Sequence, residues 1–266
     1  MRKVNRLLMT GAAGIVGAQL RPGLGELAHH VRLSDVADLG EAAPHEEIVP
    51  CDLTDTDRLR ELVRGCDAVL HFGGVSTENT AELIHKVNIE GTYHLYEAAR
   101  KEGVKRMLFA SSNHAIGFHK REDRLVGSSP VRPDSNYGVS KVYGEGLASL
   151  YWDKYGIETL IVRIGSCFPQ PKDRRMMATW LSAADFLRLI GRMLDAPRLG
   201  CPIVYGVSDN DEQWWDNREA AFLGWVPRDS SRQFAHLFDD AAQEDPNDPA
   251  VIYQGGGFAK AGHYED

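Results

Sequence analysis

The stretch TGAAGIVG, residues 10–17, follows the apolar run RLLM and leads into AQLRPGL. It places three glycines, Gly11, Gly14 and Gly17, where a strand should pass into a helix, although glycine weakens both kinds of element. In a strand–turn–helix unit Gly11 permits the tight turn, Gly14 lets the backbone approach a pyrophosphate, and Gly17 lets helix and strand pack closely. Amides at the helix start then favour an anion. The stretch predicts a dinucleotide-binding turn, with an ordinary glycine-rich loop as the alternative.

Short apolar runs and amphipathic segments alternate along the first two thirds of the chain. We expect strands at residues 6–10, 31–35, 46–53, 68–74, 106–112 and 159–167, and helices at 54–65, 81–103 and 137–156. Parallel neighbours need crossover connections, and right-handed crossovers place helices on both faces of a sheet. The pattern therefore predicts an α/β fold, a Rossmann-type doubly wound parallel sheet.

Regularity falls after residue 167, where prolines divide short segments. We expect an NAD-binding domain over residues 1–167 and a small substrate-binding lobe, integrated with it, over 168–266. The tail stretches DPNDP (245–249) and QGGGF (254–258) read as loop. Three aromatic residues are expected to pack this lobe rather than stack on a ligand: Trp214, Trp215 and Trp225.

Composition excludes several classes of function. Of 266 residues, 43% are hydrophobic and 26% charged, and no apolar run approaches the ~20 residues of a membrane helix. The amino-terminal stretch has no long apolar region or cleavage site, so we expect a cytoplasmic protein. A net charge of −8 disfavours nucleic-acid binding. The four cysteines are widely separated, with no histidine at ligand spacing, which predicts reduced thiols and no metal site.

Tyr137 and Lys141 lie four residues apart in an expected helix, so both side chains project from one face. A free phenol, with a pKa of about 10, is a poor base at neutral pH, but a nearby ammonium group stabilises the phenolate and lowers that pKa. Such a tyrosine can take the proton of an alcohol while its carbon gives up a hydride. An exposed helix pair is the ordinary meaning of this spacing, and the nucleotide-binding half before it favours catalysis. Ser111 and Ser112 end a strand at the ligand-binding edge of the sheet, where one of them can orient the reacting oxygen.

Asp35 ends the second expected strand, where its carboxylate would accept hydrogen bonds from an adenosine ribose and repel the extra phosphate of NADP. NAD is therefore the expected cofactor. Asp38 is the alternative acceptor, and a solvent-exposed or capping role for Asp35 stays open. Residues suited to the adenine edge and to the end of the fourth strand are Asp52, Leu53, Gly73, Gly74 and Val75.

These motifs, TGAAGIVG, CDL, HFGG, FASSNHAIG and YGVSK, together resemble the extended branch of the short-chain dehydrogenase/reductase superfamily over essentially the whole cofactor half. The resemblance implies Tyr137 as general base, Lys141 as the group that holds the nicotinamide ribose and lowers the tyrosine pKa, and Ser112 as their hydroxyl partner. Asn136 departs from the family, in which proline usually precedes the tyrosine. A plain helix role for Asn88 stays open. The implied NAD site comprises Gly11, Gly14, Ile15, Val16, Gly17, Asp35, Asp52, Leu53, Phe72, Gly73, Gly74, Val75, Asn88, Tyr137, Lys141 and Cys167.

Further stretches, SSNHAIG, RIGSCFPQP, RRMMATWLS, NDEQWWDN and FLGWVP, resemble the bacterial uronate dehydrogenases over nearly the full length. This resemblance implies oxidation of glucuronate or galacturonate at C1 to the aldarolactone with NAD. Arg175 matches the carboxylate-binding position, with Arg174 beside it as the local alternative, and a guanidinium can grip both carboxylate oxygens. The implied substrate site comprises Ser76, Ser112, Asn113, His114, Tyr137, Ser166 and Arg175.

Two other functions stay open at this stage. An epimerase or reductase of another sugar would keep the same tyrosine and lysine but bind a nucleotide sugar, for which the 129 residues after Tyr137 leave little room. A regulator that senses NAD(H) without turnover is the other, and the intact tyrosine–lysine pair disfavours it. The helices expected at 81–103 and 137–156 carry enough apolar surface for a homo-oligomer, and the alternative that they only cover the sheet stays open.

Overall fold

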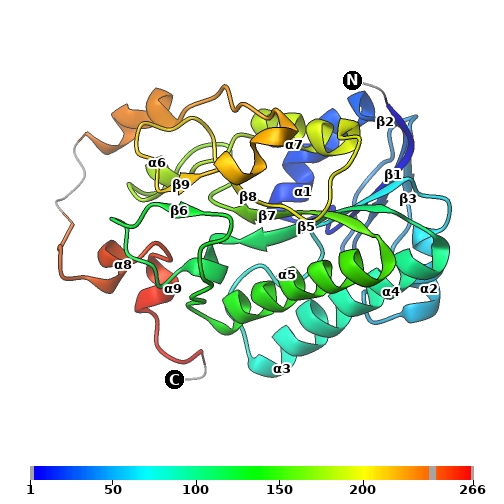
Figure 1. The fold of residues 1–266 in the computed structure, drawn as a ribbon, viewed down its shortest axis with the longest axis horizontal. Helices are drawn as coiled ribbons and strands as arrows, with labels where there is room; N and C mark the ends of the chain where they lie inside the picture. Colours follow the sequence, from blue (N-terminus) through cyan, green and yellow to red (C-terminus); the bar gives the residue numbers. More distant parts are fainter. Residues whose placement is uncertain (1–2, 240–243, 265–266) are drawn as a thin grey trace.

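The computed structural model describes residues 3–239 and 244–264. Its centre is one parallel sheet with the strand order β3-β2-β1-β4-β5-β7-β8 (Figure 1). The strands are Val4–Thr10 (β1), Ala28–Ser34 (β2), Glu46–Ile48 (β3), Ala68–His71 (β4), Arg106–Ser112 (β5), Glu158–Ile164 (β7) and Ile203–Gly206 (β8). The order reverses between β1 and β4, and open parallel sheets bind ligands at the carboxyl ends of strands at such a reversal. The predicted doubly wound sheet is confirmed.

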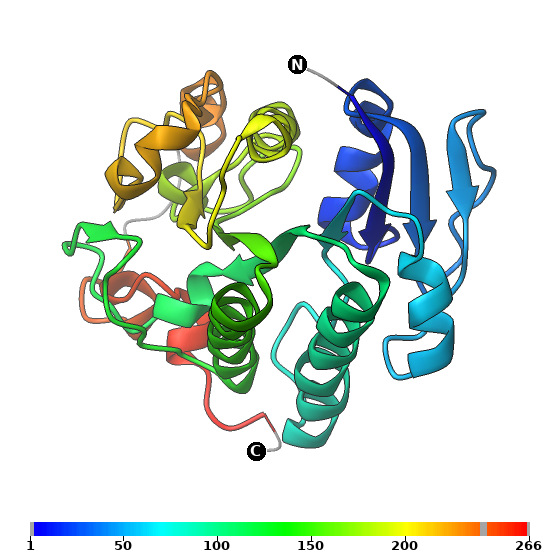
Figure 2. The same ribbon diagram turned by 45° about the vertical axis from the view of Figure 1, so that its right-hand side comes forward.

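Helices cover both faces of the sheet (Figure 2). One face packs against α1 (Ile15–Leu20), the 3₁₀ helix η1 (Arg21–Glu26) and α7 (Ala183–Asp195), and the other against α2 (Thr56–Val63), α4 (Gly91–Glu102) and α5 (Asn136–Tyr155). Side chains alternate along each strand, so Leu7 and Met9 of β1 belong to the first core and Leu8 to the second. Within the described part of the chain, no helix has the length and apolar character needed to cross a membrane.

Several elements differ in extent from the sequence-based expectation, and the third strand and the helix expected over 81–103 differ most. β3 ends at Ile48, earlier than expected, and its ladder with β2 closes with the hydrogen bond from the Val49 amide to the Leu33 carbonyl at 2.9 Å. The long helix expected over 81–103 is divided into α3 (Ala81–Ile84), a π-helical turn η2 (His85–Glu90) and α4. A π-helical turn is wider than an α-helical one and is frequent at functional sites.

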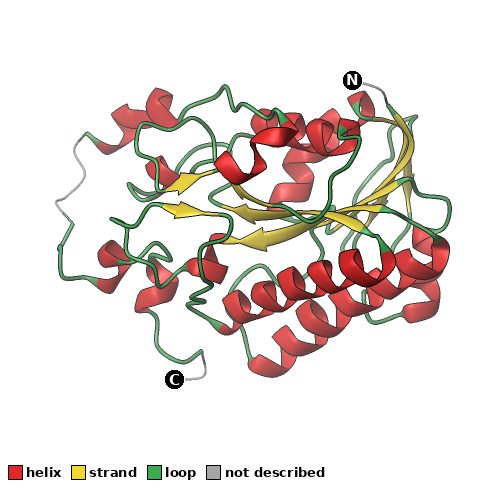
Figure 3. Cartoon of the chain, in the orientation of Figure 1, coloured by secondary structure: helices red, strands yellow, loops and turns green. Residues whose placement is uncertain are grey.

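The sheet does not stop at the division expected after residue 167. β8 and α7 come later in the chain, yet they belong to the same sheet and core as β1. A smaller core holds Trp214 and Trp215 with Ile116 and Tyr205. The division at 167 therefore falls inside the doubly wound unit. β6 (Leu125–Val126) pairs with β9 (Trp215–Asp216). With this pair, the elements at the left of Figure 3 are α6 (Met176–Thr179), η5 (Ser231–Phe238), α8 (Pro249–Ile252) and α9 (Gly257–Lys260). The 3₁₀ helix η4 (Arg218–Leu223) follows β9.

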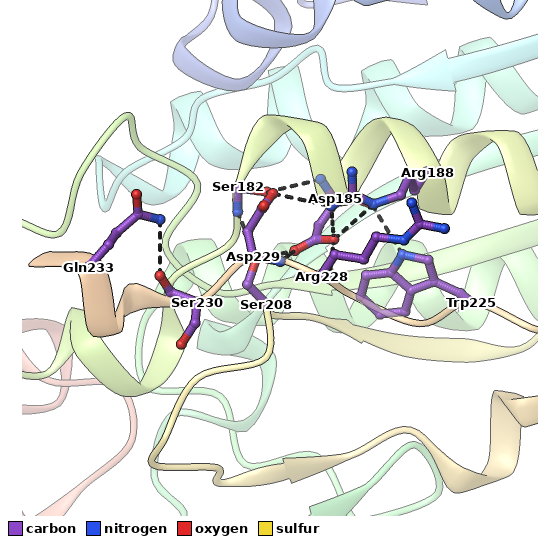
Figure 4. A network of polar contacts seen from close by, with 9 residues as sticks. All are labelled: Ser182, Asp185, Arg188, Ser208, Trp225, Arg228, Asp229, Ser230 and Gln233. Carbon is purple, nitrogen blue, oxygen red and sulfur yellow. Dashed lines mark hydrogen bonds and ion pairs between the residues drawn. The ribbon is translucent and has the colours of Figure 1, made fainter.

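The loop after η4 is tied to the first turn of α7 by the carboxylate of Asp185, which is fully buried (Figure 4). Its Oδ1 accepts a hydrogen bond from the Arg228 amide at 2.7 Å, and its Oδ2 accepts from the Asp229 amide at 3.0 Å and from Ser208 Oγ at 2.7 Å. Trp225 Nε1 donates to the Asp185 carbonyl at 3.1 Å and packs against the first core. One carboxylate therefore holds this loop against the sheet.

Candidate active site

The glycine turn leaves no room for side chains at two of its three glycines. Gly11 has φ +70°, and a Cβ there would lie 2.4 Å from the backbone carbon of Phe72. A Cβ at Gly17 would lie 2.4 Å from the Gly11 carbonyl oxygen. Gly14 is looser, with that same oxygen 3.2 Å away, and it begins α1 without any side-chain cap. The first amides of α1 therefore have no side-chain partner at this turn, as a pyrophosphate site requires.

Asp35 lies beside this turn. Its Oδ2 accepts a hydrogen bond from the Ala13 amide at 2.9 Å, and its Oδ1 accepts from the Ala37 amide at 3.1 Å. Asp38, the alternative acceptor, is exposed and its Oδ1 accepts from the Gly40 amide. A half-buried carboxylate at the turn fits an adenosine ribose, so the residues present suit a dinucleotide.

The segment that follows the carboxyl end of β4 is built on small residues. A Cβ at Gly73 would meet Leu53 Cδ1 at 3.2 Å, so the buried Leu53 lies under this backbone. Asp52 stands exposed beside it and accepts hydrogen bonds from the amide and hydroxyl of Thr54, both at 2.8 Å. The hydrogen bonds from Thr54 lower the pKa of Asp52. The loop carries an ionised acceptor at its rim.

Asn88, on the π-helical turn η2, connects this loop to α5. Its Oδ1 accepts from the Val75 amide at 2.7 Å, and its Nδ2 donates to the Val75 carbonyl at 2.9 Å. The same Nδ2 donates to Ser140 Oγ at 3.1 Å, and Ser140 Oγ donates to the Tyr137 carbonyl at 2.7 Å. A Cβ at Gly74, whose φ is +140°, would lie 2.9 Å from Asn88 Oδ1. Asn88 thus fixes the loop beside β4 relative to the helix that carries Tyr137.

Tyr137 and Lys141 lie in the first turns of α5, and both are buried. Ser135 caps this helix by accepting from the Gly138 amide at 2.9 Å. Glu78, from the loop after β4, accepts from the amides of Asn136 at 3.0 Å and Tyr137 at 2.8 Å. Asn136, which stands where the family usually has proline, therefore has a backbone amide that donates a hydrogen bond. Lys141 Nζ lies 5.3 Å from the centroid of the Tyr137 ring.

Burial determines the protonation of this pair. It raises the pKa of Tyr137 to about 12, against an opposing hydrogen bond with Ser112, and it lowers the pKa of Lys141 to about 8. The expectation that Lys141 lowers the pKa of Tyr137 concerns the complex with NAD and stays a prediction. Loss of water disfavours the charged form of both groups, and in the chain alone this effect exceeds any attraction between them.

Arg175 and Asn113 meet in the interior. The Asn113 amide oxygen accepts from Arg175 Nη2 at 2.6 Å, and its nitrogen donates to the Ile164 carbonyl at 3.2 Å, in the amide orientation that satisfies both groups. Arg175 Nε donates to the Gln254 carbonyl at 2.8 Å, and burial lowers the pKa of Arg175 to about 10. Arg174 instead lies exposed and donates to the Phe238 carbonyl at 3.0 Å. Of the two arginines, Arg175 is the one that faces the candidate site.

His114 lies on the 3₁₀ turn η3 (Asn113–Ile116), directly after β5. Its ring forms a T-shaped contact with Tyr137, with centroids 5.8 Å apart, and stacks on Phe258 at 3.9 Å. Phe258 also packs edge-on against Tyr137 at 6.2 Å. Ser112, Asn113, His114 and Tyr137 are therefore brought together as expected, with Phe258 as an addition.

Three more residues were expected at the site. Ser166 is buried and shares a hydrogen bond of 2.8 Å with the Thr179 hydroxyl. The Cys167 carbonyl accepts from Gln19 Nε2, on α1, at 2.9 Å, which ties the end of β7 to the glycine-turn helix. Ser76 is exposed on the loop after β4. Ser76 and Cys167 follow β4 and β7 in the chain, whereas the Ser166 hydroxyl is paired with that of Thr179.

The C-terminal stretch QGGGF contributes more to the site than a loop tail would. A Cβ at Gly255 would lie 1.9 Å from Asp134 Oδ2, and one at Gly256, where φ is +63°, would lie 2.7 Å from Arg175 Cδ. Sequence reasoning missed this stretch, and it also missed Glu78 and Asp134. The signal was present in three consecutive glycines followed by an aromatic residue, because such a run permits buried side chains to lie directly on the backbone.

The parallel sheet with its glycine turn after β1, and the buried tyrosine and lysine one turn apart on α5, define the chain as a Rossmann-type protein of the short-chain dehydrogenase/reductase class. Residues 7–196 match the profile of the NAD dependent epimerase/dehydratase family. The chain belongs to this family.

Individual relatives show which members of the family this chain resembles. A uronate dehydrogenase of Pseudomonas putida is 54% identical over 98% of this chain and 97% of that protein. A glucuronic acid dehydrogenase from Chromohalobacter salexigens superposes with a TM-score of 0.97 at 59% identity, covering 99% of each chain. A mutant uronate dehydrogenase from Agrobacterium tumefaciens complexed with NAD gives a TM-score of 0.94 at 48% identity, covering 97% of this chain and 98% of that one. The resemblance to uronate dehydrogenases expected from the sequence is confirmed.

Proposed function

We propose that the chain catalyses the NAD-dependent oxidation of a hexuronate, D-glucuronate or D-galacturonate, at C1 to the aldaro-1,5-lactone. The observation that carries this proposal is the half-buried Arg175, whose guanidinium is hydrogen-bonded to Asn113 between β5 and the C-terminal stretch. A half-buried cation close to a tyrosine–lysine pair suits a small acidic sugar, because a guanidinium binds both oxygens of a carboxylate in one plane. The similarity to uronate dehydrogenases supports the same substrate class.

The proposed chemistry assigns one task to each side chain. Tyr137, as the phenolate, takes the proton of the anomeric hydroxyl, and that oxygen becomes the carbonyl oxygen of the lactone as C1 loses a hydride. Bound NAD supplies the acceptor for this hydride. Ser112 donates a hydrogen bond to the reacting oxygen, and the Lys141 ammonium holds the nicotinamide ribose and stabilises the phenolate. Arg175, with Asn113 and His114, holds the sugar in place.

The proposed NAD site uses the elements around β1 and β4. The turn at Gly11 and Gly14 and the first amides of α1 hold the pyrophosphate, and Asp35 holds the adenosine ribose. The loop backbone fixed by Asn88 borders the nicotinamide half.

A spectrophotometric assay tests the proposed function. Purified protein is mixed with NAD and either D-glucuronate or D-galacturonate, and NADH absorbance is followed, with NADP and with UDP-glucose as comparison reactions. We expect NADH to form with at least one uronate and NAD. No signal with either uronate, together with turnover of the nucleotide sugar, would contradict the proposal and favour a sugar epimerase or dehydratase reaction.

We also propose that the chain works in the cytoplasm as a homo-oligomer. Cys51, Cys66, Cys167 and Cys201 are all free thiols, as expected in a reducing compartment. Apolar side chains on α4 and α5 are exposed: Tyr93 by 44%, Tyr143 by 37% and Leu150 by 44%. Burial of these side chains against a second copy would remove apolar surface from water. Light scattering after size-exclusion chromatography is expected to give a multiple of 29.5 kDa, and a monomer mass would contradict the assembly.

A further inference from the structure

The imidazole of His114 is fixed at one end and open at the other. Its Nδ1 lies 2.8 Å from Oδ2 of Asp134, and its ring is stacked on Phe258. The Asp134 side chain has no exposed surface, whereas 15% of the His114 side chain stays exposed. Among the described residues, none forms a hydrogen bond with His114 Nε2. The free nitrogen is therefore available to a ligand in the site that Tyr137 and Arg175 border.

Asp134 is itself held closely by its surroundings. Its Oδ1 accepts from Ser135 Oγ, the cap of α5, at 2.8 Å. A Cβ on Gly117 would lie 1.8 Å from Asp134 Oδ2, and one on Gly255 would lie 1.9 Å from it. The Gly255 amide donates to the Gly117 carbonyl at 2.8 Å, so the two glycines close around the carboxylate. The carboxylate thus has little freedom to move away from His114.

The chemistry of the two groups decides where the imidazole proton lies. An ionised carboxylate only accepts hydrogen bonds, so the proton between the two side chains belongs to His114 Nδ1. In the neutral ring Nε2 is then an acceptor. The stack on Phe258 and the T-shaped contact with Tyr137 keep the ring from turning over.

We propose that Asp134 is a positioning residue, which holds His114 in the tautomer whose Nε2 accepts a hydrogen bond from a hydroxyl of the sugar. This inference rests on the proposed function and deepens it. Without the carboxylate, the ring is free to carry its proton on Nε2. Nε2 would then be a hydrogen-bond donor and could not accept the hydrogen bond of the sugar hydroxyl. The same logic, a carboxylate that fixes the tautomer of a histidine, is general in enzyme sites.

A double-mutant cycle tests this role. Asp134→Asn is expected to lower kcat/KM for the uronate by about 10- to 100-fold while leaving NADH affinity, measured by fluorescence titration, unchanged. In the His114→Ala background the same change is expected to cause no further loss, because a residue that acts through His114 has nothing left to position. Losses that multiply in the double variant would overturn the proposal.

Asp211→Asn is the control, since the exposed Asp211 carboxylate pairs with Arg232 on the surface. We expect kinetics like those of the unmodified protein.

Nitrogen NMR of the unmodified protein gives a readout that does not depend on folding of the variants. His114 is expected to carry its proton on Nδ1, and a proton on Nε2 would overturn the inference. If the unmodified protein oxidises no uronate, the proposed function fails; if it does and the losses multiply, only this inference fails.

Discussion

Tyr137 and Lys141 are a pair whose chemistry is set by burial. Each is held almost without water, and so each favours its uncharged form, with the pKa of the phenol raised to about 12 and that of the amine lowered to about 8. Under the proposed function, the pKa of Tyr137 is expected to fall when the positively charged nicotinamide ring binds. Ser112 already favours the phenolate through its hydrogen bond. Under that proposal, the phenolate forms in the complex with NAD rather than in the free chain.

The first residue-scale prediction concerns Tyr137→Phe. This change removes the hydroxyl and keeps the ring that packs against His114 and Phe258. We expect kcat to fall by about 10²- to 10⁴-fold, because the general base is lost, with NADH affinity unchanged. Steady-state kinetics and fluorescence titration measure the two quantities. Turnover close to that of the unmodified protein would remove Tyr137 from the proposed role.

The second residue-scale prediction concerns the stability cost of Lys141. Its pKa is about 8 in the folded chain against 10.5 for the unshifted group, so the ionised lysine destabilises the fold below pH 8. This cost falls to zero as the pH rises from 8 to 10.5. Lys141→Met is therefore expected to raise Tm at pH 7 and to lose activity, and its advantage in Tm should vanish near pH 10. An equal Tm for both proteins at pH 7 would contradict this account.

At the scale of single elements, α5 and α7 are both anchored by buried carboxylates. Glu145 on α5 pairs with Arg163 on β7 at 2.8 Å and accepts from Ser111 Oγ on β5 at 2.6 Å. Asp185 on α7 holds the loop at Arg228 and Asp229 through their backbone amides. Each carboxylate joins elements that are far apart in the chain, and so each fixes its helix on the sheet.

The prediction at this scale is that Asp185→Ala destabilises the fold by about 3 kcal/mol or more. The change leaves the amides of Arg228 and Asp229 and the buried Ser208 hydroxyl without their acceptor. Urea unfolding followed by circular dichroism measures the free energy of unfolding. Asp211→Ala is the control, since Asp211 pairs with Arg232 on the surface and its loss is expected to change the free energy of unfolding far less. Equal losses in the two variants would contradict the prediction.

The elements themselves were largely predictable, because they obey local rules. Buried parallel strands are short apolar runs. The glycine turn has positions where only glycine fits, as the contacts at Gly11 and Gly17 confirm. The π-helical turn at His85–Glu90 was not predictable from periodicity. Its hydrogen bonds shift register so that Asn88 reaches both Val75 and Ser140, and those partners lie on other segments.

At the scale of the whole molecule, the C-terminal stretch returns to the sheet and completes the candidate site. Gln254 is fully buried; its side chain donates to the carbonyls of Lys120 and Asp123 at 2.9 Å and accepts from Trp215 Nε1 at 2.8 Å. The same residue presents its carbonyl to Arg175. This anchored residue therefore fixes both the C-terminal stretch and the guanidinium that is proposed to bind the substrate.

Gly256→Ala is the prediction at this scale. The added Cβ would lie 2.7 Å from Arg175 Cδ at a backbone φ of +63°, so Arg175 or the backbone must move. We expect KM for the uronate to rise at least several-fold, with KM for NAD nearly unchanged. Gly257→Ala is the matched control, since a Cβ at that neighbouring position meets nothing within 4 Å. An effect of equal size in both variants would contradict the argument.

The candidate site divides into parts that sequence alone can and cannot predict. Tyr137 and Lys141 were identified because their relation is local, one helical turn. Asp134 and Phe258 were missed because their roles depend on contacts with residues distant in the chain, such as His114 with Phe258. The pKa shifts of Tyr137 and Lys141 in the free chain could not be predicted from the sequence, because the extent of burial is a property of the assembled core.

The placement of Gln254 and Phe258 has a consequence for biosynthesis. A ribosome that has translated residues 1–250 has made every strand of the central sheet and the proposed dinucleotide site, but neither the carbonyl that orients Arg175 nor the ring that stacks on His114. Under the proposed function, the nascent polypeptide therefore acquires its nucleotide site before its sugar site, and loss of residues 254–266 during expression is expected to abolish the second and spare the first.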